Sequence, residues 1–197
     1  VRPRSVETVH KMAKYGFMGV KIPEEFGGSG ADNLTYVLMN EELARVDAAL
    51  CIYANTSNSL GGGPLMLAGN LEQKKKYLPQ IASGEKILAF ALTEPSAGSD
   101  ASGVRTTAKQ EGDEWVINGS KCFITCAEYA QVFTVIAQTD KSKGVKGLTA
   151  FLVEADRPGI SIGNHEDKMG IRTSNTCDVF FDNLRVPSDH IIGKVGD

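Results

Sequence analysis

Two short segments of the chain carry residues that could bind a polar ligand. The first spans residues 90–100 and joins an apolar run to a loop with hydroxyls, a proline and a glycine. Pro95 fixes φ and lacks a backbone N–H, whereas Gly98 can adopt a positive φ. Such a loop can turn its remaining amides, together with the hydroxyls of Thr93 and Ser99, toward a ligand. A surface turn of the same composition is the alternative.

The second segment is Phe123-Ile124-Thr125, at the end of a β-prone run. An aromatic ring there could cover a flat ligand while the Thr125 hydroxyl bonds to the ligand's edge. Phe123 as a core residue and Thr125 as a good strand former are the alternatives. The order and spacing of the two segments together suggest a flavin site.

Composition excludes several other classes of function. The chain has 197 residues, of which 42% are hydrophobic and 23% are charged, so it can form one large or two small domains with a core. A net charge of -3 is too small to indicate a nucleic acid or an anionic membrane as partner. No apolar run reaches the length of a membrane span.

The four cysteines do not suggest a metal site. Cys51, Cys122, Cys126 and Cys177 contain no Cys-x-x-Cys pair, and the three histidines do not cluster near them in the sequence. We therefore expect free thiols, which fit a reducing compartment, and no metal.

Helical signals dominate residues 1–87. A helix is expected over residues 48–58, ending before the glycines at 61–63, which we interpret as a connection between helices and not as a phosphate-binding loop. Asn70 with Gln73 has the spacing of a capping box for a following helix.

Residues 88–197 are predicted to form mostly strands. Asn118-Gly119 lies between β-prone residues and predicts a hairpin turn. The sequence thus predicts an α+β protein of several domains, in which an N-terminal all-α helical domain precedes an all-β, barrel-like domain. Further strands are expected over residues 132–137, 148–153, 160–162 and 179–181.

With these motifs in place, the chain resembles the acyl-CoA dehydrogenase family nearly end to end. The segments that carry the resemblance are Gly16-Phe17-Met18-Gly19, Pro23-Glu24-Glu25-Phe26-Gly27-Gly28, Glu41-Glu42-Leu43-Ala44-Arg45, Glu72-Gln73-Lys74-Lys75-Lys76-Tyr77-Leu78-Pro79, Leu92-Thr93-Glu94-Pro95, Gly98-Ser99-Asp100, Asn118-Gly119-Ser120-Lys121, Phe123-Ile124-Thr125 and Lys168-Met169-Gly170-Ile171-Arg172.

The resemblance implies non-covalent FAD and oxidation of a short- or medium-chain acyl-CoA to the trans-2-enoyl-CoA. A glutamate removes the α-proton while the β-hydride passes to the flavin, and the protein supplies alignment. It implies substrate contacts from Ser99 to the pantetheine arm and from Ile52 and Thr56 to the acyl chain. The implied flavin-site residues are Phe90, Ala91, Leu92, Thr93, Glu94, Pro95, Gly98, Ser99, Phe123, Ile124 and Thr125.

The chain departs from the family pattern in two places. Where the family often has Asn-Gly after Thr125, this chain has Cys126-Ala127, and Ala tolerates a positive φ poorly. The resemblance also places the catalytic glutamate in a C-terminal four-helix domain, which we expect to be absent from these residues. No residue here, Glu94 included, is therefore assigned as catalytic, and we expect the 197 residues alone to be inactive and to hold FAD weakly.

The resemblance implies electron-transferring flavoprotein as acceptor and a homotetramer for the full-length protein. We expect a location in the bacterial cytoplasm, or in the mitochondrial matrix for a eukaryotic source. An acyl-CoA oxidase, a non-catalytic flavin- or acyl-CoA-binding module of the same fold, and a structural domain without a ligand are the alternatives.

Overall fold

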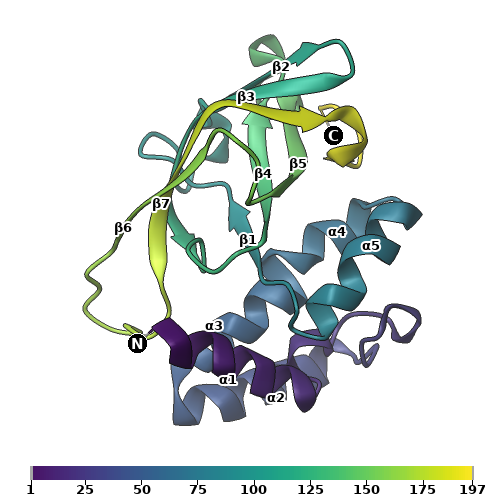
Figure 1. The fold of residues 1–197 in the computed structure, drawn as a ribbon, viewed down its shortest axis with the longest axis vertical. Helices are drawn as coiled ribbons and strands as arrows, with labels where there is room; N and C mark the ends of the chain where they lie inside the picture. The colour runs from purple at the N-terminus through teal and green to yellow at the C-terminus, as the bar shows by residue number, and fades with distance from the viewer. Residues whose placement is uncertain (1, 197) are drawn as a thin grey trace. The chain divides into compact units, whose positions relative to one another are not determined.

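The computed structural model describes residues 2–196, with side chains from residue 6 onward, and these residues form two compact units. The helical unit comprises the residues up to 88 together with 167–175. The β unit comprises residues 89–166 and the chain from residue 176 onward. Helices thus precede strands along the chain, as predicted (Figure 1).

Side-chain caps start three helices of the helical unit, and one of the caps is the Asp47 carboxylate, which accepts from the backbone N–H of Ala49. Asp32 accepts a hydrogen bond from the backbone N–H of Thr35. Asn70 and Gln73 form the predicted capping box, in which each side chain accepts from the other's backbone N–H. The helices are α1 (Arg2–Lys14), α2 (Asn33–Val46), α3 (Ala48–Asn55), α4 (Gly62–Ala68) and α5 (Leu71–Ala82).

The helix predicted over residues 48–58 does end before the glycines, but the interpretation of residues 61–63 as only a connection between helices is wrong. After α3 the chain continues as a π-helical turn, Thr56–Leu60, and Gly62 already opens α4. The π turn closes with a bond from the Gly61 N–H to the carbonyl of Thr56. A Cβ on Gly62 would lie 2.0 Å from the Ser57 carbonyl oxygen, so the missing side chain permits this close packing.

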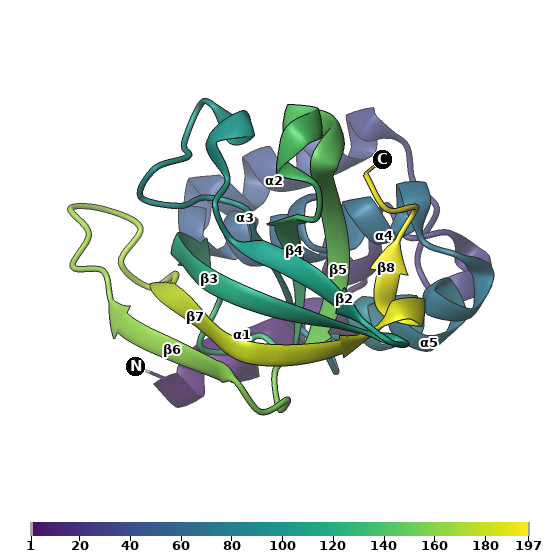
Figure 2. The same cartoon turned by 90° about the horizontal axis from the view of Figure 1, so that it is seen from above.

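The β unit forms one eight-stranded sheet within the described residues. Its order is β6-β7-β3-β2-β4-β5-β8 (Figure 2). Strand β1 pairs with β4. A buried apolar core that includes Ile117, Phe133, Phe151 and Val179 lies against it. The strands are β1 (Leu88–Ala91), β2 (Thr107–Glu111), β3 (Glu114–Thr125), β4 (Val132–Gln138), β5 (Leu148–Glu154), β6 (Ile160–His165), β7 (Thr176–Pro187) and β8 (Ile191–Ile192).

The predicted hairpin at Asn118-Gly119 is also wrong, because both residues lie inside the long strand β3. The turn falls earlier, between Glu111 and Glu114, where Gly112 has a φ of 64°. Asn118 instead marks a shift of register between β3 and β7, and its side-chain oxygen accepts from the Asn183 N–H at 2.8 Å. Asn118-Gly119 is therefore part of a β-bulge and not of a turn.

Membrane-spanning and metal-binding features are both missing from residues 2–196. No helix in this range combines the length and the apolar character that crossing a membrane requires. No group of three or more His, Cys, Asp or Glu side chains in the same range could hold a metal ion. The four cysteines are free.

Gly62→Ala should destabilise the helical unit by about 2 kcal/mol, because the new methyl group must displace the Ser57 carbonyl. Gly63→Ala is the matched control, since nothing lies within 4 Å of its added Cβ. The control should be neutral or stabilising by up to about 1 kcal/mol. Urea unfolding midpoints measure both changes, and equal midpoints for the two variants would contradict the packing argument.

Candidate functional site

Three contacts fasten the loop after β1 to the middle of β3. The Lys121 ammonium donates to the Leu92 carbonyl at 3.0 Å and to Glu94 Oε1 at 2.7 Å. The backbone N–H of Cys122 donates to the Thr93 carbonyl at 2.9 Å. The two segments that the sequence singled out therefore lie side by side, with Phe123 directly after the residues that hold the loop.

Glu94 and Lys121 form a buried ion pair whose other bonds are satisfied locally. The Lys121 residue is 0% exposed and Glu94 is 4% exposed. The backbone N–H of Thr106 donates to Glu94 Oε1 at 2.9 Å, and that of Arg105 donates to Oε2 at 2.7 Å. The cation and the two amides replace the water that the carboxylate loses on burial. A charge can be buried only where it has such partners.

The pair also fixes the protonation of both groups. Burial alone would raise the pKa of the Glu94 carboxyl, but the bonds from Lys121, Thr106 and Arg105 hold that pKa below its usual value. Burial lowers the pKa of the Lys121 ammonium, and Glu94 opposes that shift. Glu94 is thus an engaged, ionised anchor, which agrees with leaving it unassigned as a base.

Cys122 offers no nucleophile beside the loop. Burial raises the pKa of its thiol, and the nearby carboxylates of Asp178, Glu166 and Glu94 raise it further. A protonated, buried thiol is unreactive.

The loop itself turns tightly at Pro95-Ser96. Glu94 and Ala97 exchange both backbone hydrogen bonds, each at 3.0 Å, so Pro95 occupies the first central position of a two-residue turn. Gly98 does not use its freedom to adopt a positive φ, because the turn is completed before it. A Cβ at Gly98 would meet nothing within 4 Å.

Phe123 stands in a β-bulge that exposes its ring. The pairing of β3 with β7 shifts register between Lys121 and Ile124, and Phe123 has a φ of 58°. Its side chain is 62% exposed although it belongs to a central strand of the sheet. A bulky residue in the left-handed region is strained, and such strain concentrates at functional sites.

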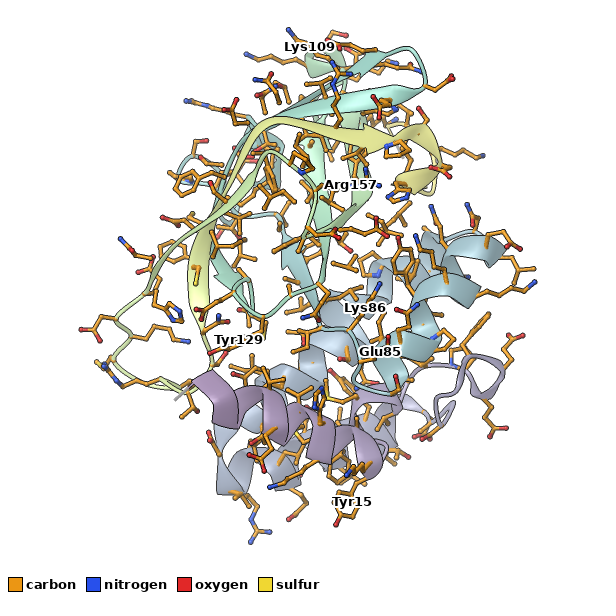
Figure 3. The ribbon with its side chains drawn as sticks, viewed as in Figure 1. Tyr15, Glu85, Lys86, Lys109, Tyr129 and Arg157 are labelled. Atoms are coloured by element: carbon orange, nitrogen blue, oxygen red, sulfur yellow. The ribbon has the colours of Figure 1, made fainter. Side chains whose placement is uncertain are left out.

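The turn after Thr125 resolves the question raised by Cys126-Ala127. Cys126, and not Ala127, takes the positive φ, at 62°. The Cys126 carbonyl then accepts from the N–H groups of Tyr129, labelled in Figure 3, and of Ala130. Position 127 therefore imposes no requirement for glycine.

Three hydroxyls in these segments are available to a ligand. Those of Thr93, Ser99 and Thr125 have no hydrogen-bond partner in the part of the chain that the structure describes. Together with an exposed aromatic ring they fit the polar edge and flat face of a flavin. Ala91 and Ile124 differ, since their side chains belong to the core and leave only their backbone groups for a ligand.

The other expected contacts divide between the two units. Phe90 is half-buried on β1, and Pro95 is exposed at the turn. Ile52 and Thr56 belong to the helical unit, where Ile52 is half-buried on α3. Thr56 starts the π turn, and its hydroxyl donates to the Tyr53 carbonyl at 2.8 Å.

Sequence reasoning missed Lys121 as a determinant of the site. A signal was present, because Lys121 shares its side of β3 with the core residues Trp115 and Ile117 at even spacing. A lysine on the buried face of a strand requires a carboxylate partner. The same reasoning could not have found Arg105, which contributes through its backbone N–H.

Breaking the buried pair from one side should be costly. Glu94→Gln and Lys121→Met should each lower the free energy of unfolding by about 3–5 kcal/mol, because each leaves one buried charge uncompensated. The double variant should lose less than the sum. The control is Arg185→Met, which breaks exposed pairs with Glu111 and Glu114 and should cost under about 1 kcal/mol. Denaturant titration measures all four, and additive losses would contradict the coupling.

Lowering the pH should reduce the free energy of unfolding, because Glu94 becomes protonated. Because its folded pKa lies below its ordinary value of 4.5, the unfolded chain binds the proton more readily. The contribution of Glu94 is therefore present above that ordinary value and is lost as pH falls through the folded pKa. Free energies of unfolding measured from about pH 6 to about pH 3 should fall more steeply for the wild type than for the double variant. Parallel curves would refute this assignment.

Comparison with known proteins identifies the family. Its models for the "Acyl-CoA dehydrogenase, N-terminal domain" and "middle domain" match residues 2–85 and 89–184. The caffeyl-CoA reductase-Etf complex subunit CarC of Acetobacterium woodii is 48% identical over 189 residues, which cover 96% of this chain and 50% of that protein.

Two solved structures share the fold closely. Butyryl-CoA dehydrogenase from Megasphaera elsdenii has a TM-score of 0.92 and 42% identity, over 96% of this chain and 51% of that one. Acyl-CoA dehydrogenase complexed with FAD from Bacillus anthracis has a TM-score of 0.91 and 39% identity, over 98% of this chain and 33% of that one. The chain spans about half the length of the curated relatives it matches. It belongs to the acyl-CoA dehydrogenase family.

Proposed function

We propose that this chain supplies one wall of the flavin site of an enzyme that oxidises a short- or medium-chain acyl-CoA to the trans-2-enoyl-CoA. The observation that carries the proposal is the exposed ring of Phe123, held at a positive φ beside a loop with free hydroxyls. The family membership and the likeness to butyryl-CoA dehydrogenase support the reaction class.

In this proposal FAD, when bound, accepts the hydride from the β-carbon of the thioester. The residues of this chain bind and orient it. Phe123 covers one face, Thr125 hydrogen-bonds the edge where the hydride arrives, and the segment from Phe90 to Ser99 lines the ring and the ribityl chain. Ser99 also contacts the pantetheine arm, and Ile52 and Thr56 line the acyl chain.

The proton at the α-carbon requires a base that we do not assign within residues 1–197. Glu94 is excluded from that role because its carboxylate is committed to Lys121 and two amides. We accordingly propose that these residues alone are inactive and hold FAD weakly, and that the full-length protein is a homotetramer in the bacterial cytoplasm or the mitochondrial matrix. Butyryl-CoA oxidation by the 197 residues alone would contradict this.

Electron-transferring flavoprotein is the proposed redox partner. Its support is the relative whose name places it in a caffeyl-CoA reductase-Etf complex. The same relative favours a second candidate, which is reduction of an aryl-substituted enoyl-CoA, the reverse direction of the same chemistry.

Anaerobic titration of the full-length protein with butyryl-CoA tests the proposal. Loss of the oxidised flavin absorbance should follow, with recovery on adding electron-transferring flavoprotein and only slow recovery in air. Fast recovery in air would indicate the oxidase alternative, and no bleaching by a panel of acyl-CoAs would indicate the binding module. With reduced electron-transferring flavoprotein as electron donor, reduction of caffeyl-CoA can instead be measured. A rate of caffeyl-CoA reduction above the rate of butyryl-CoA oxidation would favour the reductase.

Thr125→Val should weaken FAD binding about tenfold, because one hydrogen bond to the flavin is lost from an environment that cannot replace it. Ser161→Ala, which removes an exposed hydroxyl from β6, should leave binding unchanged. Titration of the apoprotein with FAD, followed by flavin fluorescence, measures both. Equal affinities for the two variants would remove Thr125 from the site.

A further inference from the structure

The connection between β6 and β7 does not belong to the unit that contains the two strands. Residues 167–175 group with the helical unit, whereas β6 before them and β7 after them group with the β unit. We call residues 167–175 the β6–β7 loop, and Figure 2 shows it beyond the ends of the two strands. Its base is closed by a bond from the Glu166 N–H to the Thr176 carbonyl at 2.9 Å. The loop therefore leaves the sheet at a fixed point, and its further path depends on what holds it in the helical unit.

Contacts within the β6–β7 loop stiffen it. Arg172 pairs with Asp167 at 2.7 Å, and its guanidinium also donates to the Lys168 carbonyl at 2.6 Å. The Lys168 ammonium donates to the Ser174 carbonyl at 2.5 Å. Ile171 has a φ of 52°, which is a strained conformation for a β-branched residue. A loop braced in this way transmits a displacement from one end to the other instead of absorbing it.

Two side chains at α3 hold Thr173, near the end of the loop. The Tyr53 hydroxyl, from the last turn of α3, donates to the Thr173 carbonyl at 2.9 Å. The Thr173 hydroxyl donates to Oδ2 of Asp47, the residue that caps the start of α3, at 3.3 Å. Tyr53 is 2% exposed and makes the shorter of the two bonds. We therefore expect its hydroxyl to contribute more than Asp47 to holding the loop.

A short buried segment joins Thr173 to a neighbour of the flavin site. Ser174 and Asn175 are buried, and Thr176 then begins β7 as the Cα partner of Thr125. Residues directly opposite one another on antiparallel strands have adjacent side chains. The three residues from Thr173 to Thr176 span at most about 11 Å, so little chain is available to absorb a shift. A displacement of Thr173 should therefore reach the residue that pairs with Thr125.

We propose that Tyr53 is a positioning residue for the flavin site. Its hydroxyl holds Thr173, the buried segment that follows sets the position of Thr176, and Thr176 keeps Thr125 in place at the edge of the flavin. The inference rests on the proposed function, which assigns Thr125 to that edge. A hydroxyl bonds to a ligand only within a narrow range of distance and angle, so a small shift of Thr125 is enough to weaken its bond.

Hydrogen exchange in the full-length protein without FAD tests the hold on the loop. Tyr53→Phe removes only the hydroxyl and keeps the Tyr53 carbonyl that accepts from Thr56. The backbone N–H of Ser174, which is hydrogen-bonded inside the loop, should exchange about fivefold faster in this variant. The matched control is Tyr36→Phe, which removes a phenolic hydroxyl that donates to Asn55 on α3 and should leave exchange at Ser174 unchanged. Unchanged exchange in Tyr53→Phe would overturn the proposal.

A double-mutant cycle with Thr125→Val tests the route to the flavin. When the apoprotein is titrated with FAD and flavin fluorescence is followed, Tyr53→Phe should weaken binding about threefold, and Tyr36→Phe by less than about 1.5-fold. In the Thr125→Val background Tyr53→Phe should have no further effect, because the bond through which it acts is already lost. The same weakening in both backgrounds would show that Tyr53 acts by another route and would overturn the proposal.

The single variants separate this inference from the proposed function. If Thr125→Val weakens FAD binding and Tyr53→Phe does not, the positioning role alone is refuted. If Thr125→Val leaves FAD binding unchanged, the assignment of Thr125 to the flavin edge is refuted, and the positioning role is refuted with it. Exchange at Ser174 then still decides whether the Tyr53 hydroxyl holds the β6–β7 loop.

Discussion

The buried ion pair between Glu94 and Lys121 is the interaction on which the arrangement of the β unit's candidate site depends. Removing two charges from water is expensive, and the expense is tolerated only where every remaining lone pair finds a donor. Here the carboxylate uses Lys121 and two successive amides, and the ammonium also reaches the Leu92 carbonyl. One pair of side chains therefore fixes three segments relative to one another: the loop after β1, the approach to β2 and the middle of β3. A hydrophobic pair of equal size would fill the space but would not specify where those segments lie.

Local strain next to this anchor follows from the same arrangement. Because Lys121 must point inward and Ile124 must rejoin the core, the pairing of β3 with β7 is interrupted between them. The bulge places Phe123 at a positive φ with its ring outside the core. The packing of β3 on either side of the bulge stabilises this strained backbone conformation. An exposed, rigidly held aromatic ring is suited to a flat ligand, whereas a ring on a flexible loop would lose entropy on binding.

The helical unit also contains an irregular segment, which close backbone packing holds in place. The π turn interrupts the α-helical path between α3 and α4, and Gly61 and Gly62 let the backbone approach to distances that any side chain would forbid. This places Thr56 at the start of the irregular turn with its hydroxyl bonded to the chain. Both units thus interrupt a regular element at a residue expected to contact ligand, one through a bulge and the other through a π turn.

The sequence by itself determined the order of helices and strands, the capping box at Asn70 and Gln73, and the family, because these depend on local propensity or on motifs that run along the chain. Two glycine-containing segments were misread for the same physical reason. Asn118-Gly119 and residues 61–63 both have the composition of turns. Gly119 is instead needed for close approach to Thr106, which is distant in the sequence. Gly62 is needed for close approach to Ser57, which the π turn brings near. Only the tertiary structure decided that Lys121 holds the loop after β1 through Leu92 and Glu94. Contacts between residues far apart in sequence depend on which strands pair and on where bulges shift their register, and the apolar pattern of one strand does not specify its partner.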